Sequence, residues 1–235
     1  MHIAALVAYL EGVRENNNKA WFVMNKPAYD ILRDEFTALV AEVIRELGRS
    51  DPRIAGVDAK KALFRFHRDI RFSNDKTLYK TRFSAAIAEP GHKHSGPMYY
   101  FSIDADGILH LAAGCYLPDR DVLARLRRHV VRDARGLKRV LGKKEFAATF
   151  GALDESDKLK RLPKSFDADS PGVAAMTEWL KLKSYVVSTN RDVAGKRNAD
   201  SIAKLPQNIA ATLALATPLN TWLRAALRAE PGEDA

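Results

Sequence analysis

The densest group of side chains that could bind or transform a ligand lies in the stretch RFHRDIRFSNDKTLYK, residues 65–80. Its charged residues are three arginines at every third position, two lysines and two aspartates: Arg65, Arg68, Arg71, Lys76, Lys80, Asp69 and Asp75. Planar guanidinium groups bind phosphate oxygens in a bidentate manner, and lysine adds a point charge. We therefore predict an anion-binding site with the five cations as ligands, in which Asp69 orients an arginine.

The same stretch allows two other interpretations. In the first, Asp69 and Asp75 neutralise their arginine neighbours in a partly buried ion-pair network that fixes the end of a strand, because buried charges must be paired. In the second, the site is catalytic: Asp75 is a general base or holds a divalent cation, and Tyr79 donates a proton or stacks on a base. The sequence does not separate these interpretations, and no cofactor or metal site is otherwise evident in it.

Eight positions of the stretch resemble a family signature. The family is domain of unknown function 2461, with the pattern Arg-x-x-Arg-Asp-x-Arg-Phe-x-x-x-Asp/Asn-Lys-x-x-Tyr. The matching residues are Arg65, Arg68, Asp69, Arg71, Phe72, Asp75, Lys76 and Tyr79. Similar flanking segments, among them NNNKAWFVMNKPAYD and AAGCYLPD, extend the resemblance from Tyr9 to Leu223, with departures at Leu78 (often proline in the family) and Ser165 (often glycine). The resemblance implies no established activity.

The signature also limits the chemistry by what it leaves out. Its fixed positions contain no histidine, cysteine or serine, so nucleophile–histidine catalysis and a zinc site fit it poorly. Asn17 and Lys19 resemble a second polar cluster of the family. They either support the same cleft or cap and turn the chain, and the turn chemistry of asparagine favours the second role. His92 and His94 lie in one turn between two predicted strands, and two histidines in a single loop are weak evidence for a metal site.

The positive charge of the chain is concentrated in two blocks. Residues 60–82 hold eight Lys/Arg and two Asp, a net charge of +6, and residues 120–144 hold ten Lys/Arg and two Asp, a net charge of +8, in a chain whose total is +9. Such blocks attract nucleic acid, nucleotides and other polyanions, although solvated basic helices need no ligand. Five arginines of the second block share one face if a helix continues through Gly136: Arg125, Arg128, Arg132, Arg135 and Arg139.

The composition indicates a globular protein in a reducing compartment. The chain has 235 residues, of which 46% are hydrophobic and 29% charged, so it can bury a sizeable core. Its single cysteine, Cys115, leaves no intramolecular disulfide and is expected in the core. The segment MHIAALVAYLEGV lacks the pattern of a secretory leader, and no apolar run approaches the roughly 18 residues of a membrane span. We expect a cytoplasmic protein with no membrane partner.

Hydrophobic periodicity predicts helices at both ends of the chain and strands between them. The predicted helices are 3–14, 26–47, one from Asp119, 137–150 (shorter, or broken at Gly142), 172–182, 200–215 and 218–228, and the predicted strands are 61–67, 82–88, 98–104, 108–116 and 183–189. Phe64 and Phe66 would share one face of the first strand. Short connections between successive strands indicate antiparallel pairing. The prediction is a single α+β domain over residues 1–229, with a central, mainly antiparallel sheet flanked by N- and C-terminal helices and a flexible tail at 230–235.

These observations lead to one functional hypothesis and two alternatives. The leading hypothesis is a cytoplasmic protein that binds a phosphorylated small molecule at residues 65–80, since five cations converge near one strand end. The first alternative is a nucleic-acid-binding module that uses the basic blocks 60–82 and 120–144. The second is an enzyme that processes phosphoesters, with Asp75 and Tyr79 beside the cations.

Overall fold

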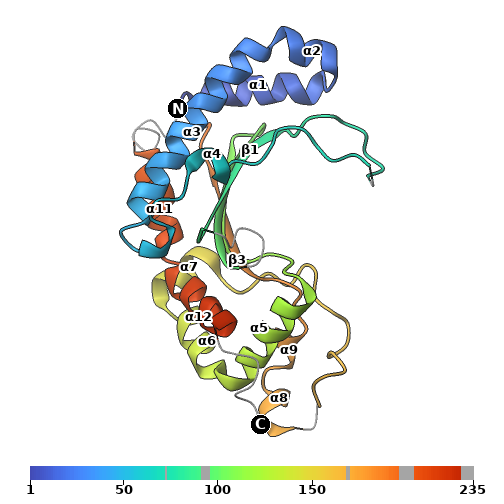
Figure 1. The fold of residues 1–235 in the computed structure, drawn as a ribbon, viewed down its shortest axis with the longest axis vertical. Coiled ribbons are helices and arrows are strands. Elements are labelled where there is room, and N and C mark those ends of the chain that lie inside the picture. The colour runs from blue at the N-terminus through green and yellow to red at the C-terminus, as the bar shows by residue number, and fades with distance from the viewer. Residues whose placement is uncertain (72, 91–95, 168–169, 196–203, 229–235) are drawn as a thin grey trace. The chain divides into compact units, whose positions relative to one another are not determined.

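The computed structural model describes residues 1–71, 73–90, 96–167, 170–195 and 204–228 (Figure 1). Its sheet has four antiparallel strands in the order β1-β2-β3-β4. The strands are β1 (Arg82–Ala88), β2 (Met98–Asp104), β3 (Ile108–Cys115) and β4 (Tyr185–Asp192). Helices precede the sheet, follow it and fill the connection between β3 and β4. The predicted α+β class and the antiparallel sheet are therefore confirmed.

The chain divides into two compact units. The first comprises Met1–Ile87, Tyr100–Leu111 and Asn190–Ala211, and the second comprises Ala88–Tyr99, Ala112–Thr189 and Thr212–Ala235. The single domain over residues 1–229 stays a prediction, and the tail at 230–235 lies outside the described residues.

The first unit begins with three helices, α1 (Ile3–Glu15), α2 (Lys19–Met24) and α3 (Lys26–Leu47). Pro27 lies in the first turn of α3, where its missing N–H is tolerated, and the helix ends at Gly48. The apolar stripe of α3 is buried as its spacing predicts: Leu32, Phe36, Leu39, Val40, Val43, Ile44 and Leu47. Phe36 contacts Phe83 of β1 and Phe101 of β2, each with ring centroids 5.5 Å apart. These contacts define the face of the sheet that α3 covers.

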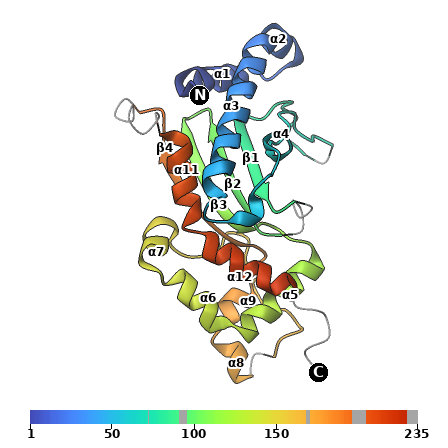
Figure 2. The same cartoon turned by 60° about the vertical axis from the view of Figure 1, so that its left-hand side comes forward.

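A second helix, α11 (Leu205–Ala214), lies beside α3 on the same face of the sheet (Figures 1 and 2). Gln207 of α11 donates a hydrogen bond to Glu42 of α3 over 3.1 Å. Side chains alternate between the two faces of a strand. Because Phe83 and Phe101 face α3, Arg82 and Tyr100 lie on the opposite face, which we call the far face.

The second unit is mainly helical. Its helices are α5 (Arg120–Arg132), α6 (Ala134–Leu141), α7 (Lys144–Phe150), α8 (Pro171–Ala174), α9 (Thr177–Leu180) and α12 (Thr217–Arg228). Asp119 caps α5 by accepting a hydrogen bond from the Val122 N–H over 3.0 Å. Trp222 of α12 donates to Asp133 over 2.9 Å, and Cys115 is buried at the end of β3, where burial raises the pKa of its thiol to about 12. Cys115 is thus a core residue, as expected.

Several predicted elements differ from the observed ones. The strand at 61–67 is wrong, because α4 (Ala59–Ala62) occupies its start and only isolated bridges follow. The helix at 172–182 is two short helices, α8 and α9, and the predicted start of the helix at 200–215 lies outside the described residues before α11. Helix α2 and the short 3-10 helix Pro52–Ile54 were not predicted.

The arginine face across Gly136 does not form. Helix α5 ends at Arg132, and Asp133 then caps α6 by accepting a hydrogen bond from the Gly136 N–H over 2.9 Å. A Cβ at Gly136 would lie 2.0 Å from Asp133 Oδ2, so the cap depends on glycine there. The cap breaks the continuous helix that the arginine spacing required.

Candidate functional site

Residues 63–85 form an antiparallel hairpin that projects from the start of β1 (Figure 1). Isolated bridges join Leu63 to Ala85 and His67 to Tyr79. The pairing shifts between them, because the Phe64 N–H bonds the Ser84 carbonyl while Phe66 pairs with Lys80. The two phenylalanines differ in burial, against the shared face predicted for them: Phe66 is buried, and Phe64 is 42% exposed. We call residues 63–67 and 78–82 the hairpin base and the described residues of 68–77 the hairpin tip.

Aromatic packing anchors the hairpin base to the N-terminal helices. Phe66 and Tyr79 are 5% and 4% exposed. The Tyr79 ring stacks on Phe22 of α2 with a centroid distance of 4.3 Å and an interplanar angle of 17°. Phe66 lies 5.1 Å from the Tyr29 ring of α3. Tyr79, which the sequence made a catalytic candidate, is held here as part of the core.

Asn17 holds the same point of the chain through its side-chain amide. Its Oδ1 accepts a hydrogen bond from the Tyr79 N–H over 2.9 Å, and its Nδ2 donates to the Tyr79 carbonyl over 3.0 Å. Asn18 accepts from the Trp21 N–H over 3.0 Å and caps α2, whose first residue, Lys19, is exposed. In this cluster the capping role belongs to Asn18, next to Asn17 and Lys19, while Asn17 supports the signature by holding its backbone.

The hairpin tip carries its own counter-charges. Arg71 binds Asp69 through Nε at 3.0 Å and Nη2 at 2.7 Å. Arg68 donates to both Asp75 and Thr77. The side chains of the pairs range from 29% exposed for Arg68 to 75% exposed for Arg71, so the network is partly buried at Arg68 and solvated at Arg71.

Hydrogen bonding also sets the chemistry of the two aspartates. The Arg71 guanidinium lowers the pKa of Asp69 to about 2. The Thr77 N–H, followed by Arg68, lowers the pKa of Asp75 to about 2. A general base works best with a pKa near the operating pH. The pKa of Asp75 therefore favours an ion-pairing role over proton abstraction.

The other signature cations divide between the two parts of the hairpin. Lys76 donates to the Ile70 carbonyl over 3.1 Å, within the tip. Arg65 lies 3.7 Å from Asp69 and is 71% exposed. Lys80 belongs to the base, where its ammonium lies 5.2 Å from the centroid of the Phe64 ring. Phe72 lies outside the described residues, as do His92 and His94.

Arg82 joins the cations of the base, although the site prediction did not include it. Burial lowers the pKa of Lys80, and the neighbouring charges of Arg82 and Arg65 lower it further. Within the described part of the chain, neither Lys80 nor Arg82 forms a salt bridge. Lys80 and Arg82 are two positions apart in an extended segment, a spacing that places side chains on one face. That alternation was the signal that could have revealed Arg82.

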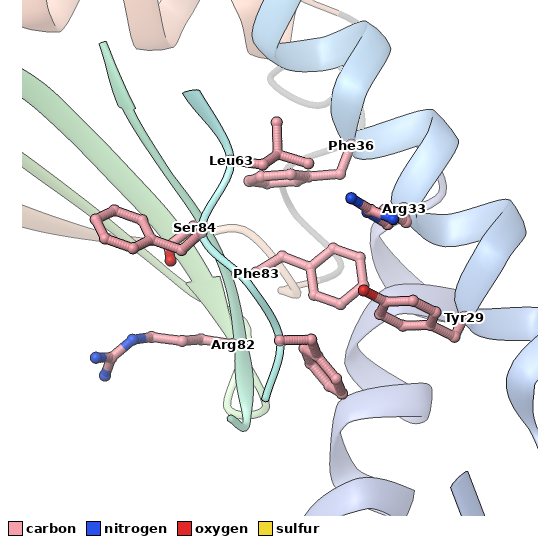
Figure 3. A pocket seen from close by; sticks show the side chains of 9 residues that line it. Tyr29, Arg33, Phe36, Leu63, Arg82, Phe83 and Ser84 are labelled. Carbon is pink, nitrogen blue, oxygen red and sulfur yellow. The ribbon is translucent and has the colours of Figure 1, made fainter. Parts of the chain in front are cut away.

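A small pocket adjoins the hairpin base. The space that it offers to the centre of a water molecule is about 10 Å³, room for about one water and far too little to enclose a small molecule. Its lining comprises Tyr29, Arg33, Phe36, Leu63, Phe64, Phe66, Arg82, Phe83 and Ser84. Figure 3 shows Arg82 pointing away from α3, on the other side of β1 from Tyr29 and Arg33. The pocket is therefore too small to enclose a ligand, and a ligand of Arg82 would lie on the surface.

The second basic block, residues 120–144, lies in the other unit. Three of its arginines bind within that unit: Arg125 donates to the Leu227 carbonyl, Arg127 to the Leu182 carbonyl over 2.8 Å, and Arg132 bonds His129 over 3.0 Å. Eight cations of the block are exposed: Arg120, Arg128, Arg132, Arg135, Lys138, Arg139, Lys143 and Lys144.

Two searches of the described residues concern metals and membranes. No three histidine, cysteine, aspartate or glutamate side chains gather in a group that could hold a metal ion there. Likewise, none of the helices described combines the length and the apolar character that crossing a membrane requires.

The fold and the hairpin define the class of this protein: an α+β protein whose sheet carries a cationic hairpin with a buried aromatic base. The chain belongs to the family of conserved hypothetical proteins called domain of unknown function 2461 (DUF2461), whose model matches residues 5–222. This match confirms the family predicted from the sequence. Neither a curated protein nor a solved structure matches the chain significantly.

Proposed function

We propose that the protein binds a phosphorylated small molecule at the hairpin base, with Arg65, Lys80 and Arg82 as the phosphate ligands. The observation that carries the proposal is the cluster of cations itself. Lys80 and Arg82 form no salt bridge in the described structure, and the charge of Arg82 lies close enough to Lys80 to lower the pKa of its ammonium further below the value that burial gives it. A bound oxyanion would relieve the repulsion between like charges, and guanidinium groups provide paired donors to its oxygens.

The proposal refines the ligand set predicted from the sequence. Arg68 and Arg71 have carboxylate partners within the tip, so an anion would compete with Asp75 and Asp69 for them. At the base, Lys80 and Arg82 offer cations without that competition, while Arg65 lies 3.7 Å from Asp69. The lowered pKa of Asp75 favours binding over phosphoester hydrolysis by general-base catalysis.

Calorimetric titration with pyrophosphate at low ionic strength tests this function. We expect saturable binding by the unmodified protein, and a loss of affinity of about tenfold or more in Lys80→Ala and in Arg82→Ala, because a charge-assisted hydrogen bond is removed in each. Arg128→Ala, which removes an exposed arginine of α5, is the matched control and should bind normally. Absence of pyrophosphate binding, or an equal loss in the control variant, would refute the proposal.

A further inference from the structure

Three rings cross the far face of the sheet beside the hairpin base. Phe64 lies next to Tyr100 of β2 with a centroid distance of 6.0 Å, and Tyr100 lies next to His110 of β3 at 5.9 Å. The interplanar angles are 66° and 64°, so each ring meets the next edge to face. His110 Nδ1 continues the row to Asn190 Oδ1 of β4, 2.6 Å away. We call Phe64, Tyr100 and His110 the aromatic row.

The row lies on the surface rather than in the core. Phe64 is 42% exposed, and Tyr100 and His110 are half-buried. Their strand neighbours Phe101, Leu109 and Leu111 are buried. A phenylalanine kept at the surface loses the free energy that burial of its ring would supply. Together with the two half-buried rings, it presents aromatic surface that a planar ligand can cover.

The cations of the hairpin base adjoin one end of this row. The Lys80 ammonium lies over the Phe64 ring, and Arg82 shares the pocket lining with Phe64 and Ser84. One ligand can therefore present a phosphate to Lys80 and Arg82 and a planar ring to Phe64 and Tyr100. Every nucleobase has a flat face that stacks on aromatic side chains, whichever base it is.

We propose that the ligand of the hairpin base is a nucleotide, whose phosphate binds Arg65, Lys80 and Arg82 and whose base lies against Phe64 and Tyr100. This inference rests on the phosphate site proposed above and adds the chemical class of its ligand. His110, paired with Asn190, extends the surface that the base meets. The same chemistry is offered by a free mononucleotide and by the 5′-phosphorylated end of a single strand.

Titration calorimetry with two matched probes tests the nucleotide. Adenosine 5′-monophosphate and ribose 5-phosphate carry the same phosphate and sugar, and only the first has a base. Stacking of one base on an aromatic side chain corresponds to roughly five- to hundredfold in affinity. We expect the mononucleotide to bind at least about tenfold more tightly. Phe64→Leu and Tyr100→Leu should each reduce that ratio, because the affinity for the mononucleotide falls more than the affinity for ribose 5-phosphate.

The outcomes separate this inference from the phosphate site. Equal affinities for the two probes would overturn the nucleotide assignment and leave the phosphate site standing, whereas no binding of pyrophosphate or of either probe would overturn both. A 5′-phosphorylated pentanucleotide of deoxyadenosine distinguishes the two sources. Binding tenfold or more above the mononucleotide identifies a strand end, and equal or weaker binding identifies the free nucleotide; both results support the base-binding role of the aromatic row.

Thermal unfolding of the two leucine variants provides the structural control. Phe64 and Tyr100 lie at the surface, so melting temperatures close to that of the unmodified protein are expected. Should Tyr100→Leu unfold, Phe64→Leu tests the row by itself, since Phe64 is the more exposed ring. Saturation-transfer difference spectra should then show contact at the adenine protons H2 and H8, and contact at the ribose protons alone would contradict the inference.

Discussion

The tip and the base of the signature hairpin contain similar residues and use them differently. At the tip, Arg68 and Arg71 are bound by Asp75 and Asp69, and the charges cancel in pairs. At the base, the rings of Phe66 and Tyr79 are buried. Lys80 and Arg82 carry no paired carboxylate in the described structure. The comparison teaches that arginine spacing alone does not locate an anion site. What matters is which cations the chain leaves unneutralised.

The largest expected effect concerns the aromatic anchor of the base. Tyr79→Ala removes a ring that is 4% exposed and stacked on Phe22, so it should lower the free energy of unfolding by about 3 kcal/mol, as for other large aromatic truncations. Urea denaturation measures this loss. The control is Phe64→Ala, an aromatic truncation in the same hairpin at a 42% exposed position, which should change the free energy of unfolding by less than about 1 kcal/mol. Equal losses would show that the buried Tyr79 ring does not anchor the hairpin.

A smaller effect is expected from the tip. Arg68→Ala breaks an ion pair whose side chains are 29% and 53% exposed, and such pairs contribute little to stability. We expect the melting temperature to fall by no more than about 3 °C, and the affinity for pyrophosphate to change less than in Arg82→Ala. Differential scanning calorimetry and titration calorimetry measure the two quantities. A large fall in melting temperature would instead assign Arg68 to the scaffold, and a large loss of affinity would move the anion site to the tip.

The smallest effect is a pH dependence confined to the tip. The pKa values of Asp69 and Asp75 are about 2 in the folded protein, below the ordinary value of 3.8. Since a lowered folded-state pKa stabilises the fold only while the carboxyl is ionised, this contribution is present above about pH 4 and is lost as the pH falls towards 2. The double variant Asp69→Asn, Asp75→Asn should therefore have a shallower decline of melting temperature across this window.

The unmodified protein is the reference for that measurement, because other carboxyls titrate in the same range. Lys158 and Lys181 lower the pKa of Glu178 to about 2 as well. Only the difference between the two pH profiles reports on the tip. Identical profiles would mean that the tip pairs contribute nothing to stability.

Much of the fold could be predicted because its signals are local. The stripe of α3 from Leu32 to Leu47 and the capping by Asp119 depend only on residues a few positions apart. The strands β1, β2 and β3 follow the same logic, since alternation of side chains is a property of the extended chain itself. The predictions failed where a local pattern met a distant partner, as at residues 61–67, where the register against β1 shifts between Phe64 and Phe66.

The candidate site was predicted in part. The sequence pointed to the stretch 65–80 and to Arg65 and Lys80 within it, but not to Arg82, Tyr100 or His110, which come from strands that only folding brings beside Phe64. It also treated Tyr79 as a free functional group, because nothing in the sequence shows that Asn17 and Phe22 surround it, 62 and 57 positions away in the chain.

By itself, the sequence determined the α+β class, the family and the segment that carries the charge, because helix periodicity, strand alternation and the signature are all properties of neighbouring residues. Only the tertiary structure decided which of those charges remain available. Asp69 and Asp75 fold back onto Arg71 and Arg68, while Lys80 and Arg82 come to lie beside an exposed ring. Whether a cation is neutralised depends on distances of a few ångströms in space, because the interaction of two charges falls with their separation.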